Sequence, residues 1–199
     1  MRDTVLSKAI IGSDTLLTKA ALVLGGTFFI ALAAQVSVPF YPVPVTLQTL
    51  AILIVGLTFG SRMGAVTLTA YLAEGAMGLP VFANGMSAPA LIGPTAGFLF
   101  GFVGMAWLAG LAVEKGLARG VVTTALCGIV ISALLYIPGV AWPMAVAEMA
   151  GMSGKWVGSS SSVIWQYWVS PFLLGDAVKA VIAAMVVWGG WKALDARKG

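Results

Sequence analysis

The chain has 199 residues, of which 60% are hydrophobic and only 9% are charged; about a quarter of the residues of a soluble protein are charged. This composition excludes a soluble globular protein and predicts an integral membrane protein, and the 11 basic residues lie mostly at the ends of apolar stretches, as topology signals do. Because histidine is absent and Cys127 is the only cysteine, histidine metal sites, Ser-His or Cys-His nucleophile pairs and an intrachain disulfide are also excluded.

The first 17 residues are expected to form a cytoplasmic or interfacial segment. Thr4 to Leu17 is mildly amphipathic, which is typical of a helix that lies on the membrane surface. Basic residues Arg2, Lys8 and Lys19 precede an apolar stretch that reaches Ala31-Leu32-Ala33, a pattern that resembles a secretory signal with its cleavage site. Since the rest of the chain is itself apolar enough to span a membrane, we interpret this stretch as a retained first helix.

Six apolar stretches predict an all-α integral membrane protein with six transmembrane helices over residues 18–191 and a cytoplasmic tail at 192–199. A helix needs about 17 to 25 residues to cross a bilayer, so the chain is expected to form a single membrane domain, residues 1–199. The predicted spans are Thr18–Val36, Val45–Gly60, Met63–Leu79, Thr95–Val113, Val121–Trp142 and Val169–Trp191.

With six spans, the basic residues other than Lys179, which stands inside the last span, fall on one side of the membrane except for Lys155. By the positive-inside rule that side is the cytoplasm, so both termini are expected to be cytoplasmic. The three outer connections, Ser37–Pro44, Gly78–Pro94 and Glu148–Trp168, are too apolar for ordinary solvated loops. Irregular backbone near membrane depth needs protein or a cavity around it, which favours a lid or vestibule over a pocket. Caps anchored at the interface by tryptophan are the alternative.

An acid and a base, Asp176 and Lys179, stand in the outer half of the last predicted span. Residues three apart share one face of a helix, so the two side chains form a single polar spot. An ionisable residue at membrane depth costs at least about 2.5 kcal/mol on insertion scales. The pair is therefore either a self-neutralising contact that fixes helix packing or part of a ligand site.

Glu74 is a third acid near the same level, in the third predicted span. Three roles are open for it: it pairs with Lys179, lines a cavity that holds a ligand, or reaches the membrane interface.

Four segments follow one another in the chain: Pro42-Val43-Pro44-Val45-Thr46-Leu47-Gln48-Thr49-Leu50, Gly78-Leu79-Pro80-Val81-Phe82-Ala83, Gly93-Pro94-Thr95 with Gly101-Phe102, and Gly175-Asp176-x-x-Lys179. In this order they resemble the signatures of the BioY family, the biotin-binding membrane subunits of energy-coupling factor transporters. The resemblance covers about Val36 to Ala184. Ala96 and Phe98 depart from it, because the family often has Gly and Tyr there, and Phe98 lacks the hydroxyl group.

The resemblance implies a site for biotin, whose ureido ring has two N–H donors and one carbonyl acceptor. Asp176, Lys179 and Asn84 match the family's polar site residues. We expect Asp176 to accept from a ureido N–H, Lys179 to donate to the ureido carbonyl or to the ligand's carboxylate, and Asn84 to contact the ring as donor and acceptor. Further candidates are Gln48 and Thr46 as second polar contacts, and Tyr71, Phe82, Phe40 and Trp168 as an apolar wall, for which ordinary packing is the alternative.

The chain is expected to be neither an enzyme nor an ATPase, with no catalytic residue, metal or cofactor. Gly154-Lys155 is followed by Trp156, so it does not complete a phosphate-binding loop. The resemblance implies that a membrane scaffold subunit and ATPase subunits supply energy in a prokaryotic cell (inner) membrane, with biotin captured outside and released inside. The alternatives are an ion-coupled secondary carrier, an intramembrane enzyme that uses Asp176, and a related subunit for another vitamin.

Overall fold

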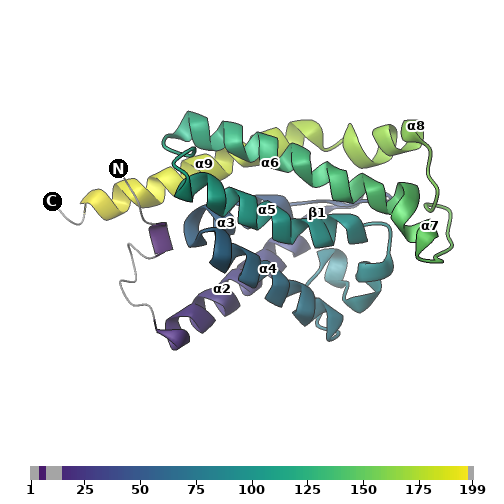
Figure 1. Ribbon diagram of the computed structural model, residues 1–199, viewed down its shortest axis with the longest axis horizontal. Coiled ribbons are helices and arrows are strands. Elements are labelled where there is room, and N and C mark those ends of the chain that lie inside the picture. Colours follow the sequence, from purple (N-terminus) through teal and green to yellow (C-terminus); the bar gives the residue numbers. More distant parts are fainter. Residues whose placement is uncertain (1–4, 8–14, 197–199) are drawn as a thin grey trace.

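The computed structural model describes residues 5–7 and 15–196, and this part of the chain is mostly helical (Figure 1). Its six long helices overlap the six predicted spans. By length and composition, four of them are able to cross a membrane: α2, α5, α9, and α6 with its continuation to Met149; α3 is a shorter apolar helix. The six are α2 (Leu16–Gln35), α3 (Gln48–Phe59), α4 (Ser61–Ala76), α5 (Ala96–Glu114), α6 (Val121–Ala141) and α9 (Leu173–Ala196).

The predicted all-α class needs one correction, because a short antiparallel ladder precedes α3. Strand β1 (Ser37–Val38) pairs with β2 (Val45–Thr46), so the second predicted span begins as a strand rather than as a helix. Pro42 and Pro44 explain the difference, since proline has no N–H to donate and restricts the residue before it to extended backbone. Helix α3 therefore begins only at Gln48.

The predicted outer connection Glu148–Trp168 is also partly helical. Helix α6 continues through a π-helical turn, η3 (Trp142–Val146), into α7 (Ala147–Met149), and α8 (Ser161–Ile164) continues through a second one, η4 (Trp165–Val169), towards α9. The helix from Val121 to Met149 has 29 residues, which is about 44 Å at 1.5 Å per residue. The hydrocarbon core of a bilayer is about 30 Å thick, so the helix from Val121 to Met149 is longer than one crossing requires.

Helix α5 lies in the middle of the bundle, between α3 and α4 on one side and α6 on the other (Figure 1). Helix α9 packs along α6 and α3, whereas α2 packs only at the edge, against α3 and α4. More than half of the most apolar part of α5 is buried (56%), against 17% for α2. The central position of α5 is consistent with its small residues, which let neighbouring helices approach.

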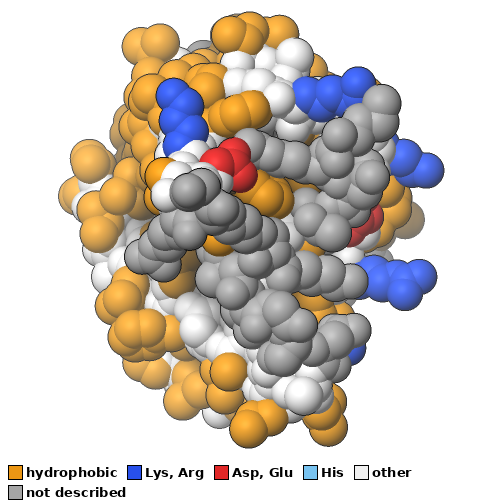
Figure 2. Space-filling view, turned by 90° about the vertical axis from the view of Figure 1, so that its left-hand side faces the viewer, with side chains coloured by type: hydrophobic (Ala, Val, Ile, Leu, Met, Phe, Trp, Pro, Cys, Tyr) orange, Lys and Arg blue, Asp and Glu red, His pale blue; other side chains and the backbone are white. Residues whose placement is uncertain are grey.

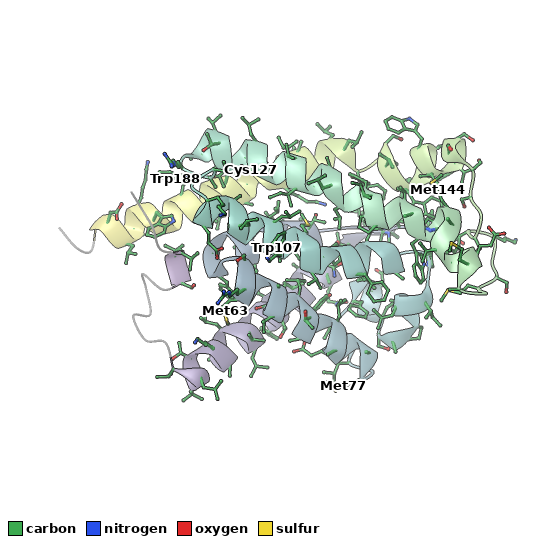
Figure 3. All side chains as sticks on the ribbon, viewed as in Figure 1. Met63, Met77, Trp107, Cys127, Met144 and Trp188 are labelled. Carbon is green, nitrogen blue, oxygen red and sulfur yellow. The ribbon has the colours of Figure 1, made fainter. Side chains whose placement is uncertain are left out.

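Apart from Lys155 and Lys179, the described basic side chains gather at the end of the molecule where both chain termini lie. Figure 2 shows that end, with Lys and Arg around its rim and hydrophobic side chains on the flanks. Met63 and Trp188 lie towards this end in Figure 3, and Met77 and Met144 towards the opposite one. Most of the predicted surface segment 1–17 and the predicted tail residues 197–199 fall outside the described residues.

Candidate functional site

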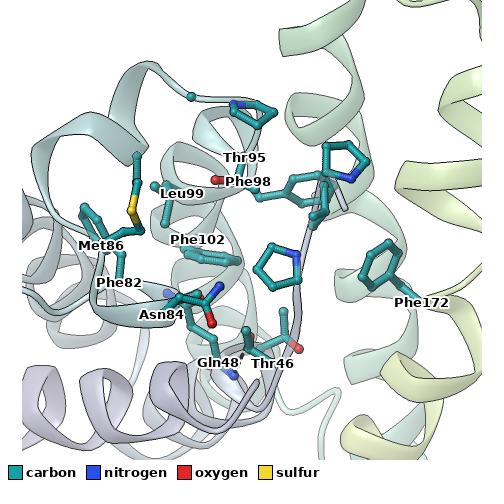
Figure 4. A pocket seen from close by; sticks show the side chains of 18 of the residues that line it. Thr46, Gln48, Phe82, Asn84, Met86, Thr95, Phe98, Leu99, Phe102 and Phe172 are labelled. Atoms are coloured by element: carbon teal, nitrogen blue, oxygen red, sulfur yellow. Dashed lines mark hydrogen bonds between the residues drawn. The ribbon is translucent and has the colours of Figure 1, made fainter. Parts of the chain in front are cut away.

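A cavity of about 320 Å³ lies at the end of the bundle away from the termini. The β1–β2 loop and the segment 82–95, which contains the short turns η1 (Ala83–Gly85) and η2 (Ala88–Ile92), line part of it. The remaining walls come from α3, α5, α6 and α9. In Figure 4, Phe172 stands across the cavity from Leu99 and Phe102, with Thr46, Gln48 and Asn84 at its base. The predicted pocket beneath the outer connections thus has a counterpart in the structure.

Most of the predicted polar site residues line this cavity. Asp176 and Lys179 project from α9, Gln48 from the start of α3, and Asn84 from η1. The predicted residues among its walls are Asp176, Lys179, Asn84, Gln48, Thr46 and Phe82.

The acid and base on α9 form an ion pair, with Lys179 Nζ 3.2 Å from Asp176 Oδ1. Both residues are only 9% exposed. Taking two charges out of water is expensive unless their remaining donors and acceptors are also satisfied. The partners that satisfy them are therefore part of the site.

Tyr136 and Thr49 are these partners. The Tyr136 hydroxyl donates to Asp176 Oδ2 at 2.6 Å. Thr49 Oγ1 accepts from Lys179 Nζ at 3.1 Å and lies 3.4 Å from Asp176 Oδ1, to which it donates. Neither residue was singled out from the sequence. Thr49 follows Gln48 directly, and Tyr136 lies in the outer half of the fifth predicted span, so a search by depth for groups that face Asp176 could have found both.

Gln48 is held by a second polar chain that contains no charge. The Tyr71 hydroxyl donates to the Val81 carbonyl at 2.7 Å and accepts from Gln48 Nε2 at 2.8 Å. Tyr71 is fully buried and does not line the cavity, so it is not the apolar wall residue that was expected. It lies behind Gln48 instead.

Asn84 has left-handed backbone, with φ of 58°, a conformation that asparagine tolerates better than most residues. Its Oδ1 accepts from the Ser37 hydroxyl at 2.7 Å, which ties η1 to β1. Gln35, at the end of α2, donates from Nε2 to the Phe82 carbonyl at 3.0 Å and accepts from the Gly85 N–H at 2.9 Å. These contacts hold the segment that carries Asn84 against the first outer loop.

Two aromatic side chains of the cavity wall lie on glycine. The ring of Phe82 packs on Gly75, and the ring of Phe98 packs on Gly139, so closely that a Cβ at either glycine would collide with the ring. Phe98, which lacks the hydroxyl group often found there in the family it resembles, stacks edge-on against Tyr136 with ring centroids 6.0 Å apart. An apolar wall thus faces the polar groups, which is the usual composition of a small-molecule site.

Three other predicted residues lie outside the cavity lining. Phe40 packs edge-on against Phe172, which does line the cavity, with ring centroids 6.0 Å apart. Trp168 is 2% exposed in the core, and its indole N–H has no partner among the described residues. Glu74 is half-buried on α4, and the ion pair of Lys179 is formed with Asp176.

The cavity groups can bind a small molecule that is largely apolar and carries both donors and acceptors. Within residues 5–7 and 15–196, no group of three or more His, Cys, Asp or Glu side chains is placed to hold a metal ion. The polar groups are instead a paired acid and base, two carboxamides and several hydroxyls.

Comparisons with known proteins match nearly the whole chain. Residues 5–196 match the model of the BioY family. A biotin transporter BioY of Thermotoga maritima is 43% identical over 90 residues, 45% of this chain and 53% of that protein. One of Rhizobium etli is 33% identical over 182 residues, 84% of this chain and 90% of the relative. The crystal structure of an S-component for biotin from an ECF-type ABC transporter has a similar fold, with a TM-score of 0.62, 21% sequence identity and coverage of 94% of this chain and 96% of that one.

Proposed function

The chain belongs to the BioY family, and from that membership we propose that it is a membrane subunit that binds biotin and mediates its uptake. It is a transport component and not an enzyme. The observation that carries the proposal is the cavity with a buried, hydrogen-bonded acid and base on one wall and aromatic rings on the other. Biotin needs both walls, because it joins a polar ureido ring to an apolar thioether ring.

The polar groups match the ureido ring in kind. Asp176 accepts from a ureido N–H, Lys179 donates to the ureido carbonyl, and Asn84 contacts the ring. The volume of about 320 Å³ lies at the lower end of small-molecule pockets, which hold about 300 to 1,000 Å³. Phe98, Phe102 and Phe172 cover the thioether ring and the start of the aliphatic chain.

The chain forms a single membrane domain that crosses the bilayer six times, with both termini in the cytoplasm. The described basic residues at one end of the bundle support this orientation, since Lys155 is the one described basic residue in the connections at the other end. The cavity then faces the outside of a prokaryotic inner membrane, where biotin is captured before its release inside.

Energy for uptake comes from a separate membrane scaffold subunit and ATPase subunits. The sequence supports this division because it contains no complete phosphate-binding loop. The solved structure with a similar fold is itself described as an S-component of an ECF-type ABC transporter. An ion-coupled carrier is not favoured. Uptake that persists with an uncoupler but stops without the ATPase subunits is the expected behaviour.

Biotin binding to the purified protein tests the site. Asp176→Asn and Lys179→Ala should each weaken binding about ten- to a hundredfold, since a hydrogen bond to a charged group contributes about 1.5 to 3 kcal/mol. Isothermal titration calorimetry in detergent gives the dissociation constants. Mass spectrometry of the small molecule that copurifies with the wild type identifies the ligand independently.

Two substitutions serve as matched controls. Glu74→Gln neutralises an acid that does not line the cavity, and Lys155→Ala removes a lysine from an outer loop. Both should leave the dissociation constant within a factor of about two, because neither side chain touches the cavity. The proposed site is wrong if the Asp176 and Lys179 variants bind as these controls do.

A further inference from the structure

We propose that Gln48 Oε1 is the second acceptor for the ureido N–H groups of the ligand, and that Tyr71 is the positioning residue that fixes this polarity. The inference rests on the proposed binding of biotin. It states that the Gln48 carboxamide presents its oxygen, and not its NH₂ group, to the ligand.

The direction follows from the chain Gln48, Tyr71, Val81. A backbone carbonyl only accepts, so the Tyr71 hydroxyl uses its single hydrogen to donate to the Val81 carbonyl. The phenol oxygen is then an acceptor, and Gln48 must turn its NH₂ group towards it, at 2.8 Å. With the amide reversed, two acceptor oxygens would face each other. Gln48 therefore keeps Oε1 for another partner.

That oxygen accepts no hydrogen bond from the described residues. It is also not fully buried, because the fully buried side-chain atoms without a partner in this part of the chain are Ser132 Oγ and Trp168 Nε1. Since Gln48 lines the cavity, the unpaired oxygen opens onto the cavity space. An acceptor in such a place needs a donor from the ligand or from water.

The Asp176 carboxylate cannot accept hydrogen bonds from both ureido N–H groups, so the ligand needs a second acceptor. A carboxylate has about four lone-pair sites, and Lys179, Thr49 and Tyr136 occupy three of them. One site is left on Oδ2, which serves one ureido N–H. The other N–H needs an acceptor of its own, and Gln48, which precedes Thr49 on α3, supplies it from the side of the cavity next to α4.

Three other polar groups of the wall, Thr95, Thr46 and Asn84, do not present an acceptor that is both fixed in direction and unpaired. The Thr95 hydroxyl can rotate to donate or to accept. Thr46 Oγ1 already accepts from the Gln48 backbone N–H at 3.2 Å. Asn84 Oδ1 already accepts from Ser37. Gln48 thus differs from Asn84, the other carboxamide of the wall, because its unpaired end is the acceptor oxygen, whereas the oxygen of Asn84 is already bonded to Ser37.

Two biotin analogues test the assignment, each with a methyl group on one of the two ureido nitrogens. Wild-type protein should bind both at least about tenfold more weakly than biotin, because each methyl group leaves one buried acceptor without a donor. Gln48→Met should lose most of the discrimination against one isomer and keep it against the other. Tyr71→Phe should weaken discrimination against the same isomer, because it frees the Gln48 amide to reverse.

A purely structural role for Gln48 and Tyr71 predicts a different result: biotin and both analogues weaken in parallel, and the ratio of their dissociation constants stays within about twofold of wild type. That result overturns the inference. Tyr167→Phe, at an exposed tyrosine outside the cavity lining, is the control and should change no ratio. If one variant fails to fold, as judged by size-exclusion chromatography, the other still gives the ratio. Failure of the proposed function is distinct, because the wild type would then not bind biotin.

Discussion

The two polar walls of the cavity are built in opposite ways. On the α9 wall, Asp176 and Lys179 carry full charges and neutralise each other, with Tyr136 and Thr49 as additional partners. On the other wall, Gln48 carries no charge and is oriented through Tyr71 by a backbone carbonyl. The charged wall supplies strong hydrogen bonds, whereas the neutral wall supplies a fixed direction. Affinity and discrimination are thus expected to depend on different residues.

The largest expected effect comes from removing one member of the Asp176–Lys179 ion pair on the α9 wall. Lys179→Met leaves Asp176 as a buried charge without its cation, which should cost about 3 to 5 kcal/mol of stability. Asp176→Leu combined with Lys179→Met removes both charges and should return stability close to that of the wild type. Biotin binding should nevertheless be weaker about ten- to a hundredfold in the single variant and weaker still in the double variant. Thermal unfolding in detergent and a binding assay measure the two effects separately. A double variant as unstable as the single one would contradict the assignment of the pair to ligand binding.

A smaller effect is expected when the ion pair loses its hydrogen bond from Tyr136. Tyr136→Phe keeps the ring that stacks on Phe98 but removes the hydrogen bond to Asp176 Oδ2. Loss of a hydrogen bond to a charged group is worth about 1.5 kcal/mol at the low end, or roughly tenfold in the dissociation constant. Titration with biotin measures it, and Tyr167→Phe is again the control. Unchanged affinity would mean that Asp176 does not need this partner.

The smallest expected effect concerns the neutral wall. Ser37→Ala removes the hydrogen bond that joins β1 to Asn84, which should cost about 0.5 to 1.5 kcal/mol, or two- to tenfold in affinity. We expect the loss mainly in the dissociation rate of biotin, since most effects of binding-site changes appear there. Stopped-flow displacement measures this rate. Ser160→Ala, whose hydroxyl bonds only to Ser162 among the described residues, should leave the rate unchanged.

The sequence was most informative about the long apolar helices and about charged residues inside them, where charge is rare. Long apolar stretches predict helices α2, α5, α6 and α9, and a charged pair inside such a stretch stands out because it is costly there. The first outer loop was harder to predict, because the start of α3 depends on which backbone groups the prolines leave free. Within the described residues, the π-helical turns η3 and η4 also had no sequence signal beyond Pro143 in the first of them.

The sequence pointed to the charged pair of the candidate site but not to the hydrogen-bond partners of that pair. A tyrosine in an apolar stretch is ambiguous, since its ring suits packing and its hydroxyl has no sequence-visible partner. Tyr136 is 40 positions from Asp176, and Tyr71 is 23 positions from Gln48. Only the packing of α6 on α9 and of α4 near the start of α3 brings each pair together. Tyr71 was therefore expected to be a wall residue rather than the group that orients Gln48.

The neutrality of the acid and base pair has an electrical consequence. Moving one elementary charge through 100 mV of membrane voltage involves about 2.3 kcal/mol of work. Asp176 and Lys179 lie 3.2 Å apart and carry no net charge together, so the voltage does almost no work on them when they change depth as a unit. The pair itself should then contribute almost nothing to any voltage dependence of uptake.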